Sequence, residues 1–284
     1  MRGWGVLFPV MLTTACGLAV SGTATSTDTE GGGLVGDAGL VDDAGSVPDG
    51  GVEPPTIEDG SVPADANPVS PITHVGTSIG TFQNPGQQIT SIPVPPDGTT
   101  YLVAIATKPF VHASTVLENP GPSTIVFTLQ HAQCGERNQT GVEVWYAKRT
   151  NPNAPNPLTV QFQTALSPPV ENAVVAISAF KGAQSIALGF ANTNPDASCV
   201  DGDENNEIAL LLPYRWPNSL VYAAVAMRQR VLSAGDGVFV FGQERSGQEG
   251  AAAGLAILGT TNDQLNAKLN ASTGWALVAV ELRP

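Results

Sequence analysis

From about residue 72 onward, short apolar or alternating runs recur along the chain, and each ends at Pro, Gly, Asn or Asp. The runs are rich in Val, Ile, Thr and Phe, residue types that favour strands. Turn residues at such regular spacing predict an all-β fold, an antiparallel two-sheet sandwich that is jelly-roll-like and has few helices. We expect strands at 74–82, 88–92, 101–107, 124–130, 142–148, 158–163, 173–180, 208–212, 220–227, 238–243, 254–258 and 275–282.

Four of these runs are almost continuously apolar, namely "TYLVAIAT", "NAVVAISAF", "SLVYAAVAM" and "GWALVAVEL". A strand with two apolar faces is covered on both, so we expect these four to be central. The run "GVEVWYAKR" alternates instead, with Val142 and Val144 on one face and Glu143 and Trp145 on the other. It predicts a half-exposed strand whose glutamate faces solvent.

The strand pattern is missing from residues 23–71. This segment holds ten carboxylates but no Lys, Arg, His or aromatic residue, and Gly, Pro, Ser, Thr, Ala and Val dominate the rest. It cannot bury enough apolar surface to offset the entropy of ordering, and its like charges repel. We therefore predict three parts: a leader at 1–22, a disordered acidic tether at 23–71 and a β-sandwich domain at 72–284.

The leader has one positive charge at Arg2, then an apolar run, then small residues, which is the pattern of a secretory signal peptide. "LTTAC" resembles a bacterial lipobox, which implies lipidation of Cys16 and attachment to a membrane through an N-terminal lipid anchor. The alternative is ordinary cleavage after Ala24, with Cys16 discarded. Either way, the chain is predicted to be extracytoplasmic, as an outer-membrane or cell-surface lipoprotein or as a secreted protein.

Most of the formal net charge of −13 comes from the tether. Residues 72–284 carry 11 basic and 15 acidic groups, a net charge of −4. A nucleic-acid binder needs a basic face to neutralise phosphates, and this domain has no such cluster of Lys and Arg. The charge distribution argues against nucleic acid as a partner.

Once Cys16 is lipidated or removed, Cys134 and Cys199 remain as a pair in an oxidising compartment. Both lie in polar sequence, "HAQCGERNQ" and "DASCVDGD", where packing of a buried thiol explains neither. We predict a disulfide that closes 64 intervening residues.

The loop "DGDENNE" places Asp201, Asp203, Asn205 and Glu207 on alternate positions. Hard cations prefer several oxygen ligands, so one interpretation is a calcium site, which would make calcium a cofactor. The other interpretation is a solvated acidic loop beside Cys199 that binds no metal.

The loop "LPYRWPN" contains Tyr214, Arg215 and Trp216 between two prolines. Flat aromatic rings stack on the apolar faces of sugars, and an arginine beside them can bind polar groups. This loop is the candidate ligand-binding site, with carbohydrate as the expected ligand. The alternative is that these side chains pack under the loop.

Signatures of catalysis are scarce. The sequence has no Gly-x-Ser-x-Gly elbow and no Gly-rich phosphate loop, and the three histidines lie far apart without zinc-ligand spacing. Glu143 and Glu281 are the strand acids that we test as a carboxylate pair for glycoside hydrolysis. Exposure to solvent explains both more simply.

The runs "VEVWYAKR", "VVAISAFKGA", "SLVYAAVAM" and "WALVAVELRP" occur in a recognisable order. This order resembles a jelly-roll-like module of secreted bacterial and environmental proteins, which shows a "VEIWY" strand and a closing "WALxxVxLxP" strand. The resemblance covers nearly all of 72–284 and implies the fold alone, because its motifs are core strands. The tether resembles linkers of surface lipoproteins from myxobacteria-like organisms.

Three functions are consistent with these features. The first is a non-catalytic, lipid-anchored β-sandwich for binding, adhesion or envelope structure, with carbohydrate or another surface protein as its partner. The second is a surface enzyme that acts on glycans. The third is a self-assembling fibre subunit whose sheet edges pair between copies. Fold alone decides none of these.

Overall fold

The computed structural model describes residues 71–118, 125–135, 139–149, 157–162, 169–187, 190–194 (191–194 by backbone alone), 199, 204–212, 215–248 and 252–284. The predicted leader and nearly all of the predicted tether lie outside these residues. The described residues form an all-β, antiparallel sandwich without helices, which confirms the predicted fold class.

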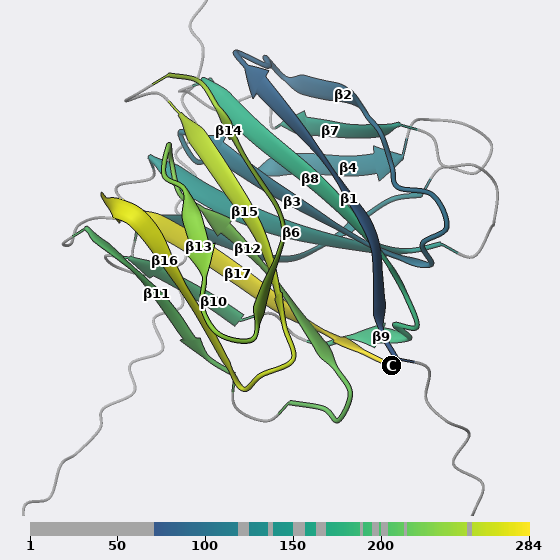
Figure 1. Ribbon diagram of the computed structural model, residues 1–284. Helices are drawn as coiled ribbons and strands as arrows, with labels where there is room; N and C mark the ends of the chain where they lie inside the picture. The colour runs from purple at the N-terminus through teal and green to yellow at the C-terminus, as the bar shows by residue number, and fades with distance from the viewer. Residues whose placement is uncertain are drawn as a thin grey trace, which may run out of the picture. The chain divides into compact units, whose positions relative to one another are not determined.

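The strands are numbered in chain order (Figure 1). They are β1 (Thr73–Gln83), β2 (Gln88–Ile92), β3 (Thr100–Lys108), β4 (Ala113–Glu118), β5 (Thr128–Gly135), β6 (Thr140–Lys148), β7 (Leu158–Phe162), β8 (Asn172–Lys181), β9 (Ser185–Ile186), β10 (Phe190–Asn194), β11 (Asn205–Leu211), β12 (Leu220–Ala226), β13 (Leu232–Ala234), β14 (Val238–Ser246), β15 (Ala253–Thr260), β16 (Gln264–Thr273) and β17 (Trp275–Arg283).

The strand order shows an internal repeat. In the first half, a sheet of order β1-β8-β3-β6-β5 is accompanied by a sheet β2-β7-β4. In the second half, the orders β10-β17-β12-β15-β14 and β11-β16-β13 reproduce the same connections, and β9 pairs only with β17. Each half has the eight-stranded arrangement of a jelly roll. We call them the first unit (β1–β8) and the second unit (β10–β17).

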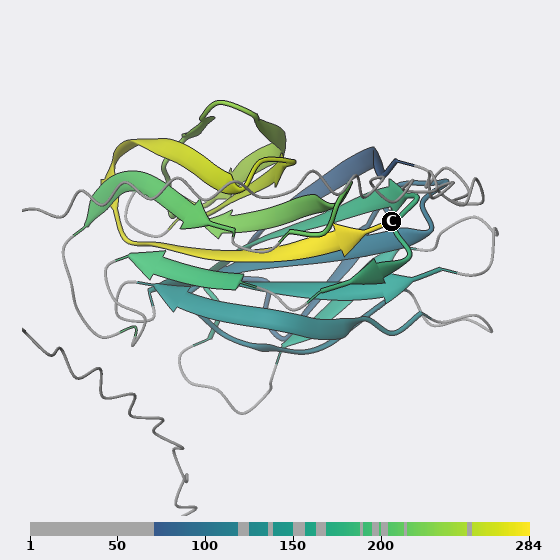
Figure 2. The same ribbon diagram turned by 90° about the horizontal axis from the view of Figure 1, so that it is seen from below.

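The two units pack through their five-stranded sheets. Leu102 and Val144 of the first unit share one buried cluster with Tyr222, Leu255 and Val278 of the second. This cluster is the central core, and small Ala side chains on the same faces let the two sheets approach closely. Figure 2 shows β17 in yellow beside the teal strands of the first unit.

Each central sheet is covered on its outer face by the three-stranded sheet of its own unit. Val103, Trp145 and Leu158 belong to the outer core of the first unit. Val225 and Leu265 belong to that of the second. The prediction of a half-exposed β6 was therefore wrong: the sheet β2-β7-β4 covers the face that carries Glu143 and Trp145, and both side chains are buried.

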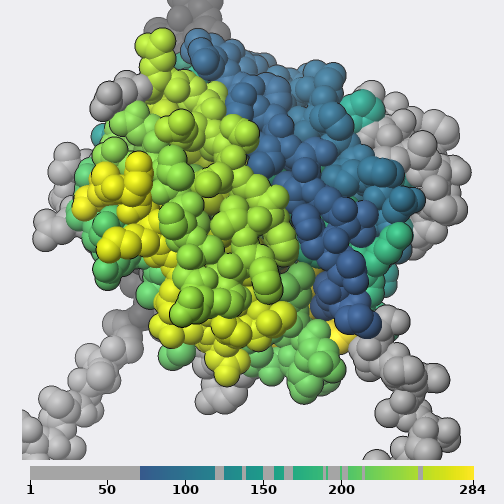
Figure 3. Space-filling view, viewed as in Figure 1, coloured from purple at the N-terminus to yellow at the C-terminus, as the bar shows by residue number. Residues whose placement is uncertain are grey.

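Two contacts join the edges of the units. β1 lies beside β14, as the dark-blue and yellow-green surfaces of Figure 3 show. There Gly242 leaves room for Ile79, because a Cβ on the glycine would lie 2.7 Å from the Ile79 side chain. On the other side β5 lies beside β10. The predicted disulfide between Cys134 on β5 and Cys199, five residues after β10, is present, with a Cα–Cα distance of 5.7 Å.

Candidate functional site

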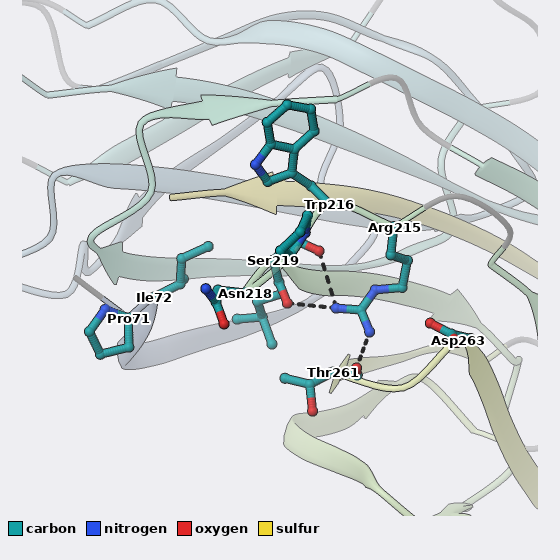
Figure 4. Close-up of a pocket in the computed structure, with 10 residues that line it drawn as sticks. Pro71, Ile72, Arg215, Trp216, Asn218, Ser219, Thr261 and Asp263 are labelled. Carbon is teal, nitrogen blue, oxygen red and sulfur yellow. Dashed lines mark hydrogen bonds between the residues drawn. The ribbon is translucent and has the colours of Figure 1, made fainter. Parts of the chain in front are cut away.

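A pocket of about 500 Å³ lies at the end of the second unit where β12 begins (Figure 4). It brings together the connection from β11 to β12, the turn from β15 to β16 and the start of the described chain. Its lining residues are Pro71, Ile72, Arg215, Trp216, Pro217, Asn218, Ser219, Leu220, Thr261 and Asp263. Two of the three residues of the predicted ligand site, Arg215 and Trp216, therefore line a pocket. The third, Tyr214, lies outside the described residues.

A tight turn from Trp216 to Ser219 shapes one wall of the pocket. The Ser219 N–H donates to the Trp216 carbonyl at 3.1 Å, and Asn218 adopts a φ of 60°, a left-handed conformation that asparagine tolerates well. The Trp216 N–H donates to Glu281 Oε1 on β17 at 2.6 Å. This bond fixes the loop to the central sheet, so the pocket wall is built on a rigid element.

Arg215 spans the pocket from the loop to the facing turn. Its guanidinium donates to the Thr261 carbonyl, to the Ser219 carbonyl at 2.6 Å and to the Ser219 hydroxyl at 3.2 Å. Its buried Nε has no acceptor. Among the described residues no carboxylate pairs with Arg215, so all its partners are uncharged.

The Trp216 indole is 56% exposed and projects to the opposite side of the loop from the Arg215 guanidinium (Figure 4). The guanidinium of Arg283 lies 5.2 Å from the centroid of the indole ring, within the range of a cation–π contact. Arg283 also pairs with Glu281 at 2.8 Å. The indole is thereby supported from the protein side while much of its surface stays open.

Glu281 is buried and anchors this arrangement. Burial alone would raise the pKa of its carboxyl, but hydrogen bonds from the Ser219 hydroxyl, the Trp216 N–H and Arg283 outweigh that effect and leave the pKa lowered. Its expected exposure to solvent was wrong, because sheet β11-β16-β13 covers this face of β17. Its donors make Glu281 a support for the loop.

Three polar side chains of the pocket have no partner in the described part of the chain. The amide of Asn218, the hydroxyl of Thr261 and the carboxylate of Asp263 make no hydrogen bond or ion pair there. They are available to a ligand with several hydroxyl groups. In Figure 4 Asp263 lies on the Arg215 side of the pocket, with no bond to the guanidinium.

Near the start of the corresponding strand, the first unit carries a tyrosine where the second unit carries a valine. Tyr101 on β3 pairs with Ala179 on β8, where the second unit pairs Val221 with Glu281. The Tyr101 hydroxyl donates to the Gly98 carbonyl at 3.1 Å and to the Pro95 carbonyl at 3.3 Å. Val221 is also buried, and the residues that line the pocket do not include it.

A second cluster with chemical potential lies in the first unit, around Glu143. This carboxylate is 1% exposed and accepts hydrogen bonds from His112 Nδ1 at 2.6 Å, Trp145 Nε1 at 3.0 Å and the Ala113 N–H at 3.1 Å. The hydrogen bond to Glu143 raises the pKa of His112, although partial burial of the ring opposes it. The His112 side chain is 51% exposed. A buried carboxylate thus orients an imidazole at the surface, an arrangement that sequence spacing did not reveal.

Glu143 and Glu281 do not form a catalytic pair. Glu143 lies in the outer core of the first unit and Glu281 in that of the second, so the two central sheets separate them. Hydrolysis by two facing carboxylates requires them on one cleft.

Of the four predicted calcium ligands, the structure describes Asn205 and Glu207. Asn205 Oδ1 accepts from the Trp275 indole N–H at 3.1 Å and from the Glu207 N–H at 3.3 Å, and the Glu207 carboxylate lies 3.8 Å from Lys268 Nζ. Asp201, Asp203 and Cys16 lie outside the described residues. Within the described ranges no three His, Cys, Asp or Glu side chains cluster as metal ligands.

Comparisons of the chain with protein-family models, with curated proteins and with solved structures found no match. In the part of the chain that the structure describes, no helix is long and apolar enough to cross a membrane.

Proposed function

We propose that this protein is a non-catalytic, extracytoplasmic binding protein, held to a membrane by a lipid on Cys16, whose double jelly roll binds glycans at the Arg215–Trp216 pocket. The observation that carries this proposal is a largely exposed indole on one side of the loop that holds Arg215 and Trp216, with unpartnered polar side chains in the pocket on its other side. A sugar offers an apolar ring face to an aromatic ring and hydroxyl groups to Asn, Thr and Asp side chains.

The location is supported by independent features. The leader and "LTTAC" indicate export and lipidation. The Cys134–Cys199 disulfide suits an oxidising compartment. Labelling with a fatty-acid analogue and membrane fractionation test the anchor, and we expect Cys16→Ala to abolish both signals.

A glycan array probed with the purified full-length protein, with and without calcium, tests the binding function. We expect calcium-independent binding to a subset of glycans, lost in Trp216→Ala. The matched control is Phe239→Ala, which removes another exposed aromatic ring, on β14. A blank array, or equal binding by wild type and Trp216→Ala, would contradict the proposed site. Binding that needs calcium would place the ligand elsewhere.

A surface enzyme acting on glycans is the second candidate, and the His112–Glu143 pair favours it. A buried carboxylate that holds Nδ1 leaves Nε2 of the imidazole free to take a proton from water or from a substrate hydroxyl. Release of reducing ends from glycans bound on the array, lost in His112→Gln but not in Trp216→Ala, would establish this alternative.

A further inference from the structure

We infer that the Arg215–Trp216 pocket selects a carboxylated sugar, a uronic acid unit within an oligosaccharide. This inference rests on the proposed glycan binding and goes beyond it by naming the ligand class. It starts from the charge of Arg215, which forms no ion pair with any carboxylate of the described residues.

Two other arginines of this molecule pair with buried carboxylates, whereas the partly buried Arg230 donates to the Ser272 carbonyl. Arg149 pairs with the buried Glu118 at 3.1 Å, and Arg283 pairs with the buried Glu281 at 2.8 Å. Arg215 donates to two carbonyls and one hydroxyl, and it is the arginine that lines the pocket described above. A partly buried charge without a counter-ion is unfavourable, so the site favours an anionic ligand group that supplies one.

The polar groups around Arg215 indicate what else the ligand carries. Asp263 also lines the pocket without a partner, and its carboxylate accepts hydrogen bonds from neutral hydroxyls. The negative charge of Asp263 repels a dianion about twice as strongly as a monoanion, which disfavours a phosphorylated sugar relative to a singly charged carboxylate. A uronic acid combines one carboxylate for Arg215 with ring hydroxyls for Asp263, Asn218 and Thr261.

The directions of the side chains set the size of the ligand. The Trp216 indole and the Arg215 guanidinium project to opposite sides of the loop (Figure 4). One sugar ring cannot stack on the first and contact the second. We therefore assign the acidic unit to the Arg215 side and a neighbouring unit of the same chain to Trp216, so the ligand spans at least two sugars.

The first test compares two ligands on the wild-type protein, so its result does not depend on whether a variant folds. Wild-type full-length protein is titrated with uronic acid polymers and with the same polymers after chemical reduction of their carboxyl groups to alcohols. We expect at least about tenfold weaker binding to the reduced polymers, and weakening of the acidic interaction as salt rises. Equal affinity for both forms, or preference for the reduced form, would overturn the acidic selectivity and leave glycan binding intact. Absence of binding to every polymer and to the glycan array would overturn both.

A variant series then assigns the carboxylate contact. Arg215→Gln is expected to bind the acidic and reduced polymers equally, while retaining the binding that Trp216 supplies. The control is Arg245→Gln, which removes an exposed arginine of β14 that donates to the Gln229 carbonyl. Unfolding curves for each variant separate loss of binding from loss of structure. Undiminished selectivity in a folded Arg215→Gln would contradict the assignment to this residue.

Discussion

At the scale of single residues, Glu143 and Arg215 differ in how their charges are compensated. Three donors surround the Glu143 carboxylate. Arg215 has only uncharged partners. Buried charges persist in proteins when hydrogen bonds and opposite charges compensate them. The first residue is therefore built into the fold, whereas we propose that a ligand supplies the missing counter-charge of the second.

The His112–Glu143 contact is expected to make the stability of the folded protein depend on pH. The hydrogen bond to Glu143 raises the pKa of His112 in the folded state, so its stabilising effect is present below the unfolded value of about 6.5 and is lost as pH rises through the folded value. In urea unfolding, we expect the stability difference between wild type and His112→Gln to be larger at about pH 5.5 than at about pH 9.

His131→Gln is the matched control for this comparison, because the His131 ring bonds only to the backbone of Ala132 among the described residues. A stability difference between wild type and His112→Gln that stays constant, or that grows with pH, would contradict a charge-assisted contact in the folded protein.

At the scale of elements, the two three-stranded sheets decide which strand faces are buried. The central strands were predicted from their continuous apolar runs, and β3, β8, β12 and β17 were confirmed as central strands. Strands β4, β9, β10, β13 and β16 were missed. In β16, Leu and Ala alternate with polar residues such as Asn and Lys. Ala, Asn and Lys are depleted in strands, so residue propensity alone disfavours a strand here. The burial of Glu143 and Trp145 could not be predicted even though β2 and β7 were, because a strand pattern does not show which distant strands cover a given face.

Substitution of a leucine on an outer sheet tests how much this cover contributes to stability. Leu265 on β16 is fully buried in the outer core of the second unit, whereas Leu211 on the neighbouring strand β11 is 69% exposed. We expect Leu265→Ala to lower the free energy of unfolding by about 2–5 kcal/mol, and Leu211→Ala to change it by less than about 0.5 kcal/mol. Urea titration followed by circular dichroism measures both. Similar losses in the two variants would mean that this sheet does not cover a packed core.

At the scale of the whole molecule, two jelly rolls share one central core and one interunit disulfide. The sequence predicted the sandwich and the cysteine pair, since both follow from local patterns and counting. It did not reveal the repeat: the equivalent strands "TYLVAIATK" and "LVYAAVA" keep small and apolar side chains but few identical residues. Of the pocket, only the loop with Arg215 and Trp216 between two prolines could be predicted from the sequence. Its polar wall comes from the distant turn at Thr261 and Asp263.

The shared core predicts that the two units unfold together. Tyr222 and Leu102 lie in the same buried cluster, so opening one unit exposes the central sheet of the other. Trp145 reports on the first unit and Trp275 on the second. In variants that keep either Trp145 or Trp275, with Trp216 and the other tryptophan of the pair replaced, we expect fluorescence to give coincident urea transitions.

Removal of the disulfide sharpens this test of cooperativity. The bond between Cys134 and Cys199 closes a loop across the two units, and such a cross-link stabilises mainly by restricting the unfolded chain. We expect replacement of both cysteines by serine to lower the free energy of unfolding by about 2–5 kcal/mol and to move both tryptophan transitions by the same amount. If the transition of Trp145 separates from that of Trp275 in this double variant, the disulfide, and not the central core, couples the units.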